Sequence, residues 1–178
     1  IKLILYYLAY QLLFIFLATG TDATIALIGG ADITANFRPG TMAISIGMLL
    51  SALAMTWHLV HFHYVKFNKE SMYEVSKKII LLCIPLLLSA QFIAGILNEA
   101  LDLTDTNQEL FISMSHNIFG VLSIAIVVPI LEEVLFRGAI EGHLLRKGWS
   151  PKWAILVSAL IFGIIHGNPA QIPFAFLI

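Results

Sequence analysis

The sequence alternates between long apolar runs and short polar segments. A helix that spans the hydrocarbon core of a membrane needs about 20 mostly apolar residues. The runs that approach this length are Leu3–Ala18, Thr41–His61, Ile79–Leu97 and Ile118 to about Leu135, followed by a shorter run, Trp153–His166, and another that opens at Pro169. The pattern predicts an all-α polytopic membrane protein, a transmembrane helix bundle with about five to six spans.

Composition supports the same class. Of the 178 residues, 59% are hydrophobic and 12% are charged, which is more apolar surface than a water-soluble domain of this length can bury. The lipid bilayer is therefore an expected partner, and a net charge of -1 argues against nucleic acid. The sequence begins at Ile1 without a methionine and stops within an apolar run, so we expect a fragment of a longer protein.

Basic residues in the short loops predict how the helices are oriented, because Lys and Arg accumulate on the cytoplasmic side. The segments Asp22–Gly40 and Asn98–Asn117 are poor in basic residues and are predicted outside. The basic residues follow the second and fourth runs, at Lys66, Lys69, Lys77, Lys78, Arg146, Lys147 and Lys152. This predicts an N-terminus inside and a bacterial plasma membrane, with an organelle membrane as the alternative.

Charged side chains lie in the most apolar part of the sequence, at Glu132, Glu133 and Arg137, and His166 ends the short run. Ionisable groups at membrane depth are costly and mark functional sites. Glu133 and Arg137 are four residues apart, so they share a helical face and can pair. Glu132 is rotated by about 100° from Glu133 and faces a different neighbour. A salt bridge that only fixes helix packing is the alternative interpretation.

A tight helical hairpin is predicted between these two regions. Gly148 suits the end of one helix, Ser150 the N-cap of the next and Pro151 its first position. On one side of this turn, Glu132 lies 13 residues before Leu145. On the other side, His166 lies 14 residues after Lys152. At about 1.5 Å per residue, both side chains are predicted roughly 20 Å from the turn.

Two irregularities are predicted near these residues. Pro129 removes one helical hydrogen bond and predicts a kink before Glu132. Gly167, Asn168 and Pro169 predict a helix break, with Asn168 as the N-cap of the helix that follows. Irregular backbone at membrane depth is tolerated where it lines a wet cavity, so we expect a catalytic water to be held at the break beside His166.

The chemistry that this set of side chains favours is hydrolysis by an activated water. Glu132 is the predicted general base, and Glu133 with Arg137 would orient it and balance its charge. His166 would hold the same water or donate toward the carbonyl oxygen. No His-Glu-x-x-His, Gly-x-Ser-x-Gly or phosphate-binding glycine loop occurs, which argues against zincins, serine hydrolases and nucleotide-binding enzymes.

Three further histidines, His58, His61 and His63, cluster at the inner end of the second run. No carboxylate or cysteine stands at ligand spacing beside them. An interfacial anchor with Trp57 and Tyr64 is therefore favoured over a metal site.

The sequence Glu132-Glu133-Val-Leu-Phe-Arg137, followed by Phe162-Gly-Ile-Ile-His166, resembles the two motifs of the CPBP family of intramembrane proteases. That family includes the CAAX prenyl endopeptidases and bacterial Abi or bacteriocin-processing relatives. The resemblance implies that residues 116–178 form the first part of a catalytic core, after N-terminal transmembrane helices over residues 1–115. The family's later motif, a His followed four positions on by Asn or Asp, is absent because the sequence stops at Ile178.

The resemblance also implies an activity. It indicates an intramembrane endopeptidase that cleaves a peptide or a membrane-anchored protein, with Glu132 and His166 activating the attacking water. Phe162 and Asn168 are expected to contact the substrate. The family has been described as metal-dependent, and a glutamate mechanism without metal is also argued. If a divalent metal such as zinc binds, Glu132 and His166 are its candidate ligands.

Two other functions stay open. A non-catalytic protein on the same fold could bind a bacteriocin and confer self-immunity. Buried Glu, Arg and His side chains also build proton relays, so a proton-coupled transporter is the third interpretation.

Overall fold

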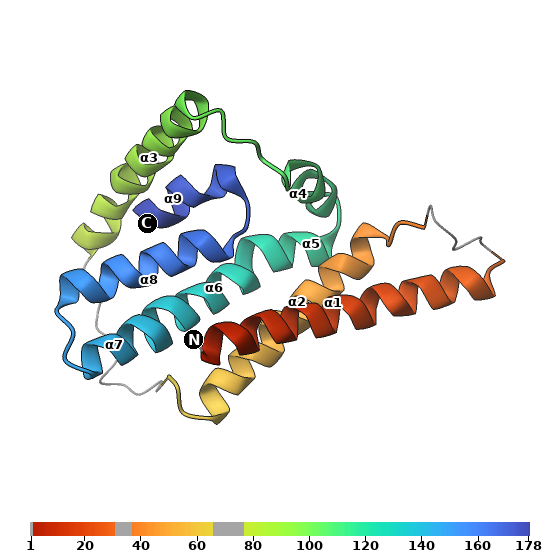
Figure 1. Ribbon diagram of the computed structural model, residues 1–178. Coiled ribbons are helices and arrows are strands. Elements are labelled where there is room, and N and C mark those ends of the chain that lie inside the picture. Colours follow the sequence, from red (N-terminus) through yellow and green to blue (C-terminus); the bar gives the residue numbers. More distant parts are fainter. Residues whose placement is uncertain (1, 31–36, 66–76) are drawn as a thin grey trace. The chain divides into compact units, whose positions relative to one another are not determined.

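The computed structural model describes residues 2–30, 37–65 and 77–178, which form helices joined by turns, with no strand among them. The main helices are α1 (Lys2–Ile28), α2 (Thr41–His61), α3 (Lys77–Ala100), α4 (Gln108–Ser115), α5 (Ile118–Leu122), α6 (Val128–Glu133), α7 (Gly142–Arg146), α8 (Pro151–Ile165) and α9 (Ile172–Leu177). Four helical runs in the described residues are long and apolar enough to cross a membrane, and α8 is a shorter apolar helix. The predicted all-α membrane fold is confirmed (Figure 1).

Helix α1 is longer than its apolar run predicted, since it continues past Ala18 to Ile28. Three threonine hydroxyls in this extension each donate to the carbonyl four residues earlier, at 2.7–2.8 Å: Thr19, Thr21 and Thr24. The helix backbone therefore satisfies these hydroxyl groups without water, and the polar residues do not end the helix. The prediction that Asp22 lies in a loop is wrong; its carboxylate instead accepts a hydrogen bond from the N–H of Gly40 at 2.7 Å.

The segment Asn98–Asn117, predicted as an outer loop, also contains helical structure. Its first residues complete α3, and α4 lies within it. Met114 of α4 is fully buried, and the hydroxyls of Thr41 and Ser113 are 2.6 Å apart. This short helix thus packs against α2, which the acidic composition of the segment did not indicate. Lys66 and Lys69, which support the predicted orientation, lie outside the described residues.

The helical run Ile118–Arg146 carries the first motif and is not a regular α-helix. Two π-helical segments, Ser123–Val127 and Val134–Glu141, lie on either side of α6. Pro129, which has no N–H to donate, lies at the start of α6, and the N–H of Val128 donates five residues back to the carbonyl of Ser123. The irregularity predicted at Pro129 therefore takes the form of a wider helical turn. Such turns often occur at functional sites.

Both predicted helix boundaries after the first motif are confirmed. Gly148 has φ +84°, Ser150 has extended backbone, and Pro151 opens α8. At the second break, Gly167 has φ +60° and a 3-10 turn, Pro169–Gln171, precedes α9. Glycine adopts positive φ at no steric cost, which is why the chain turns at these two positions.

The described chain divides into two compact units. In the first, residues 1–64 with 108–135, α2 packs against α1, α4, α5 and α6. Small residues of α2 such as Ser45, Ser51 and Ala52 are fully buried, which permits close helix approach. In the second, residues 65–107 with 136–178, α9 packs against α3 and α8. Each unit contains part of the candidate site.

Replacing Gly120 with alanine is expected to lower the free energy of unfolding by about 1–3 kcal/mol. A Cβ at this position would collide with the backbone carbonyl of Met114, and backbone moves away less readily than the end of a side chain. Thermal unfolding in detergent would measure the loss. Gly20→Ala in the same unit is the control, because nothing lies within 4 Å of a Cβ there. Equal melting temperatures for the two variants would contradict the prediction.

Candidate active site

The two adjacent carboxylates of the first motif end α6, between the π-helical segments. Glu132 is half-buried, whereas Glu133 is exposed. Leu131 and Leu135 are 1% and 0% exposed, so they anchor this turn in the apolar interior of the first unit. The neighbouring carboxylates therefore have different surroundings, and Glu132 is the one held closer to the interior.

The remaining motif residues meet around one aromatic ring in the second unit. The guanidinium carbon of Arg137 lies 4.8 Å from the centroid of the Phe162 ring, within the range of a cation–π interaction. The imidazole of His166 lies edge-on to the same ring, with the centroids 4.6 Å apart, and Phe136 lies 4.8 Å away. Phe162 is 5% exposed. Its ring thus holds the cation of the first motif and the imidazole of the second.

The hydroxyl of Ser158 on α8 connects the two segments that carry Arg137 and Phe162. Ser158 is buried, and its hydroxyl donates to the carbonyl of Phe136 at 3.1 Å. Phe136 lies in the π-helical segment that also contains Arg137. The hydrogen bond therefore ties the segment that carries Arg137 to the helix that carries Phe162.

His166 follows the last residue of α8, at the predicted helix break. Its Nδ1 lies 2.7 Å from the carbonyl oxygen of Phe162, four residues earlier. A carbonyl oxygen can only accept, so Nδ1 carries the proton in this hydrogen bond. In the neutral imidazole, Nε2 then keeps its lone pair and can accept a hydrogen bond from a water or bind a metal.

Asn168 is fully buried next to the break, and its side chain bonds to the loop that follows α3. Its amide oxygen accepts from the N–H of Thr106 at 3.3 Å, and its amide nitrogen donates to a carboxylate oxygen of Asp105 at 2.7 Å. It occupies the predicted N-cap position, but its side chain makes no capping hydrogen bond. Asn168 therefore joins the break beside His166 to an acidic loop within the same unit.

Replacing Asn168 with alanine is expected to cost about 1–3 kcal/mol of stability, because Asp105 and Thr106 lose their hydrogen bonds to this buried side chain. Urea or thermal unfolding would measure it. A double-mutant cycle with Asp105→Ala tests the cause: the two losses should not add, since each change removes the same contact. Additive losses would contradict the predicted coupling.

An aromatic residue of α1 is buried in the first unit, and the sequence motifs did not reveal it. Tyr7 is 8% exposed, whereas Leu12 and Phe16 of the same helix are 73% and 74% exposed. The burial of Tyr7 shows which face of α1 turns toward the interior of this unit.

The predicted site residues thus form two groups. Glu132 and Glu133 belong to the first compact unit, and Arg137, Phe162, His166 and Asn168 belong to the second. The predicted ion pair between Glu133 and Arg137, and the equal depth of Glu132 and His166, stay predictions. The contacts of Phe162 and Asn168 are with neighbouring protein groups, and their contact with a substrate likewise stays a prediction.

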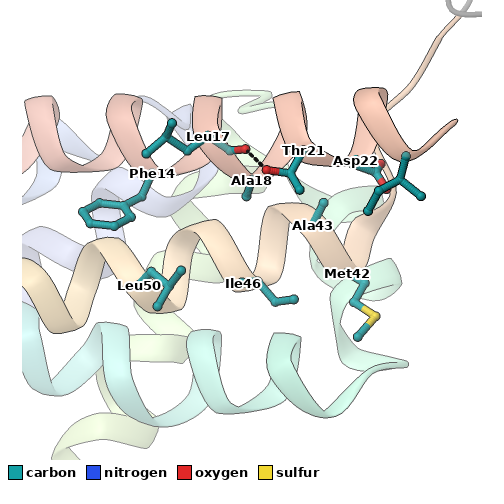
Figure 2. Close-up of a pocket in the computed structure, with 10 residues that line it drawn as sticks. Phe14, Leu17, Ala18, Thr21, Asp22, Met42, Ala43, Ile46 and Leu50 are labelled. Carbon is teal, nitrogen blue, oxygen red and sulfur yellow. Dashed lines mark hydrogen bonds between the residues drawn. The ribbon is translucent and has the colours of Figure 1, made fainter. Parts of the chain in front are cut away.

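A cavity of about 450 Å³ lies between α1 and α2. Figure 2 shows its lining, in which Phe14, Leu17, Ile46 and Leu50 supply apolar walls. Asp22 is the charged residue in this lining, and its carboxylate accepts the hydrogen bond from Gly40 described above. The cavity contains none of the predicted site residues.

A metal site needs several donor side chains close together. Within the described residues, no group of three or more His, Cys, Asp or Glu side chains could hold a metal ion. Glu132 and His166 are the donors predicted from the motifs, and a protein zinc site uses three or four protein ligands. Metal binding by Glu132 and His166 therefore stays a prediction.

The two histidines of α2 have separate environments, and His63 follows the end of this helix. His58 is buried, its Nδ1 lies 3.1 Å from the hydroxyl of Tyr10, and the rings of Tyr6 and Phe62 lie 4.8 and 4.6 Å away. His61 instead stacks on Trp57 at 4.7 Å. His58 therefore ties α2 to α1 in the interior, whereas the exposed Trp57 fits the predicted interfacial position.

A comparison with protein families matches the C-terminal part of the chain. Residues 114–178 match the family model described as type II CAAX prenyl endopeptidase, Rce1-like, a region that includes both motifs. No curated protein and no solved structure matches the chain.

Proposed function

We propose that the protein cleaves a peptide bond in a membrane-anchored protein or peptide, because residues 114–178 match the model of the Rce1-like type II CAAX prenyl endopeptidases. The observation that carries the proposal is that the matched region contains both the Glu-Glu-x-x-x-Arg and the Phe-x-x-x-His motifs. The four long apolar helices provide the membrane setting that such an activity requires. Residues 116–178 would supply the chemistry, and the helices over residues 1–115 would support it.

Glu132 is the proposed general base. It takes a proton from a water molecule whose oxygen attacks the scissile carbonyl carbon. The tetrahedral intermediate then breaks at the C–N bond, and the proton passes from Glu132 to the leaving nitrogen. The products are a new C-terminal carboxyl group and a new N-terminal amine, so one water is consumed for each bond cleaved. The half-buried position of Glu132 supports this assignment over the exposed Glu133.

His166 is proposed to hold the attacking water. The hydrogen bond from Nδ1 to the Phe162 carbonyl leaves Nε2 as an acceptor in the neutral imidazole. An acceptor can orient the water for attack, whereas donation to the carbonyl oxygen would require a proton on Nε2. Of the two roles that the sequence left open, the hydrogen bond favours the first.

Arg137 and Glu133 are proposed to set the charge around the base. A positive charge near a carboxylate favours its ionised form, which is the form that accepts a proton. Phe162 supports this role, because its ring holds the Arg137 guanidinium by a cation–π contact. Glu133 would balance the charge of Arg137. We also propose that the protein lies in a bacterial plasma membrane with its N-terminus inside.

The test is a cleavage assay with the full-length protein purified in detergent. Membrane-anchored and leader-containing peptides would be incubated with it and analysed by mass spectrometry. Two fragments that together account for the peptide plus one water would support a protease. Peptides left intact by a folded protein, with pH-dependent flux in vesicles, would instead indicate a transporter. Intact peptides with protection of cells against a bacteriocin would indicate an immunity protein.

A further inference from the structure

The strongest additional observation is that the helix break after His166 is tied to α3 by two separate contacts. The break reverses the chain, so that α9 packs against both α8 and α3 (Figure 1). Gly163 of α8 faces α9, since a Cβ there would lie 3.5 Å from the carbonyl oxygen of Ile172. His166 is therefore the last residue before a sharp reversal within the second unit.

The first contact comes from α3 itself. The amide nitrogen of Asn98 donates to the backbone carbonyl of Ala170 at 2.9 Å. A carbonyl can only accept, so the amide nitrogen of Asn98, and not its amide oxygen, points toward the break. The amide oxygen is buried and has no hydrogen-bond partner among the described residues. Within that part of the chain, the side chain therefore acts through its hydrogen bond to Ala170.

The second contact comes from the loop after α3. One carboxylate oxygen of Asp105 accepts from the amide nitrogen of the buried Asn168 at 2.7 Å and from the N–H of Asn107 at 2.9 Å. Asn168 is two residues after His166, and its backbone carbonyl accepts from the N–H of Gln171 at 3.0 Å, which closes the 3-10 turn. This loop thus fixes the chain next to the imidazole.

Both contacts start from a helix end of defined geometry. The N–H of Leu103 donates to the carbonyl of Asn98 at 2.9 Å, and the N–H of Asp102 donates to the carbonyl of Glu99 at 3.3 Å. With Asp102 at φ +50°, these two hydrogen bonds form a Schellman motif. The motif fixes the direction in which the loop carrying Asp105 leaves α3. The break is therefore held by one ordered element on both contacts.

We propose that Asn98 and Asp105 are positioning residues for His166: they clamp the chain just after it and hold the imidazole where Nε2 meets the attacking water. The inference rests on the proposed function, in which His166 holds that water. Loss of either contact lets the break shift, and a displacement of about 1 Å at a reacting group can lower the rate about 10²-fold. Both positioning residues precede the matched region, residues 114–178, so the N-terminal part of the chain would contribute to the geometry of the reaction.

The test compares Asn98→Leu with Gln91→Leu in the full-length protein, using a peptide that the wild type cleaves. Both changes remove one amide from α3, but Gln91 is exposed. We expect Asn98→Leu to lower kcat by a factor of about 10–100 and to change KM less than about twofold, because the contact acts on His166 and not on the substrate. Its melting temperature should stay close to that of the wild type, since the change also removes the buried amide oxygen. Gln91→Leu should stay within about twofold of the wild type in both constants.

A second pair of variants changes an exposed residue, so that loss of folding does not decide the result. Asp105 is exposed, and we expect its variants to fold. Asp105→Ala removes the acceptor of Asn168 and should lower kcat by a factor of about 10–100. Asp105→Asn keeps an oxygen that accepts the same hydrogen bond and should retain kcat within about threefold. Equal loss in the two variants would overturn the inference, because the charge of Asp105 would then be the cause.

A double-mutant cycle with His166→Gln separates positioning from a general loss of structure. If Asn98 acts through His166, Asn98→Leu should change kcat less than about twofold in the His166→Gln background, because the group that it positions is gone. Losses that multiply would overturn the inference. A wild-type kcat in a folded Asn98→Leu or Asp105→Ala protein, with Glu132→Gln inactive, would also overturn it and leave the proposed function intact. Full activity of Glu132→Gln would overturn both.

Discussion

Replacing Glu132 with glutamine is expected to reduce the rate of peptide cleavage by a factor of about 10²–10⁴, the usual contribution of a general base. Glutamine has nearly the same shape but cannot accept the proton of the attacking water. The helix should remain intact, since Leu131 and Leu135 provide the buried contacts of this turn. Single-turnover cleavage followed by mass spectrometry would separate this loss from weaker substrate binding.

The control for this variant is Glu141→Gln. Glu141 lies in the same helical run, at the end of the second π-helical segment, and has no proposed role in the reaction. We expect its activity to stay within about twofold of the wild type. Equal cleavage by the wild type and Glu132→Gln would reject Glu132 as the base. Equal loss in both variants would point to a general effect of carboxylate removal on this helix.

Replacing His166 with glutamine is expected to lower kcat by a factor of about 10²–10³, the usual cost of removing one hydrogen-bonding group from the reacting atoms. The change removes two features together: the Nε2 acceptor and the hydrogen bond from Nδ1 to the Phe162 carbonyl. Glutamine offers an acceptor on a flexible chain, but it cannot keep the edge-on contact with the Phe162 ring. The measurement is kcat for the same peptide, with circular dichroism to confirm helix content.

His143→Gln is the matched control, because His143 is an exposed histidine of α7 in the same compact unit. Its activity should match the wild type within about twofold. A further variant, Phe162→Leu, tests the origin of the effect. It keeps the backbone carbonyl that accepts from Nδ1 but removes the ring that contacts both His166 and Arg137. A His166→Gln protein with wild-type kcat would reject the proposed role of the imidazole.

The helix boundaries near the site could be predicted because they depend on local chemistry. Gly148 and Gly167 adopt positive φ, and Pro151 and Pro169 begin new helical turns, all within a few residues of sequence. The end of α1 could not be predicted in the same way. Its threonines return their hydrogen bonds to the helix backbone, so counting apolar residues underestimated its length.

The site likewise has a part that the sequence predicted and a part that it did not. The motif residues could be predicted because the spacing within each motif depends on one helical segment: Glu132, Glu133, Arg137 and His166. The orientation of the imidazole depends on the rotamer that brings Nδ1 to the Phe162 carbonyl. Asn168 was predicted as a helix cap, yet its amide bonds to Asp105 and Thr106, which are more than 60 residues earlier in the chain.

The sequence by itself thus determined the membrane class, the helical runs and the residues that carry the candidate chemistry. The length of an apolar run and a charge at membrane depth are constrained by the bilayer, and turn residues act on the local backbone. These features can therefore be recognised in the sequence before the fold is known. The tertiary structure alone decided that Phe162 holds Arg137 and that Asn168 bonds to Asp105 and Thr106. Those contacts join residues far apart in sequence, and they form only when the helices pack together.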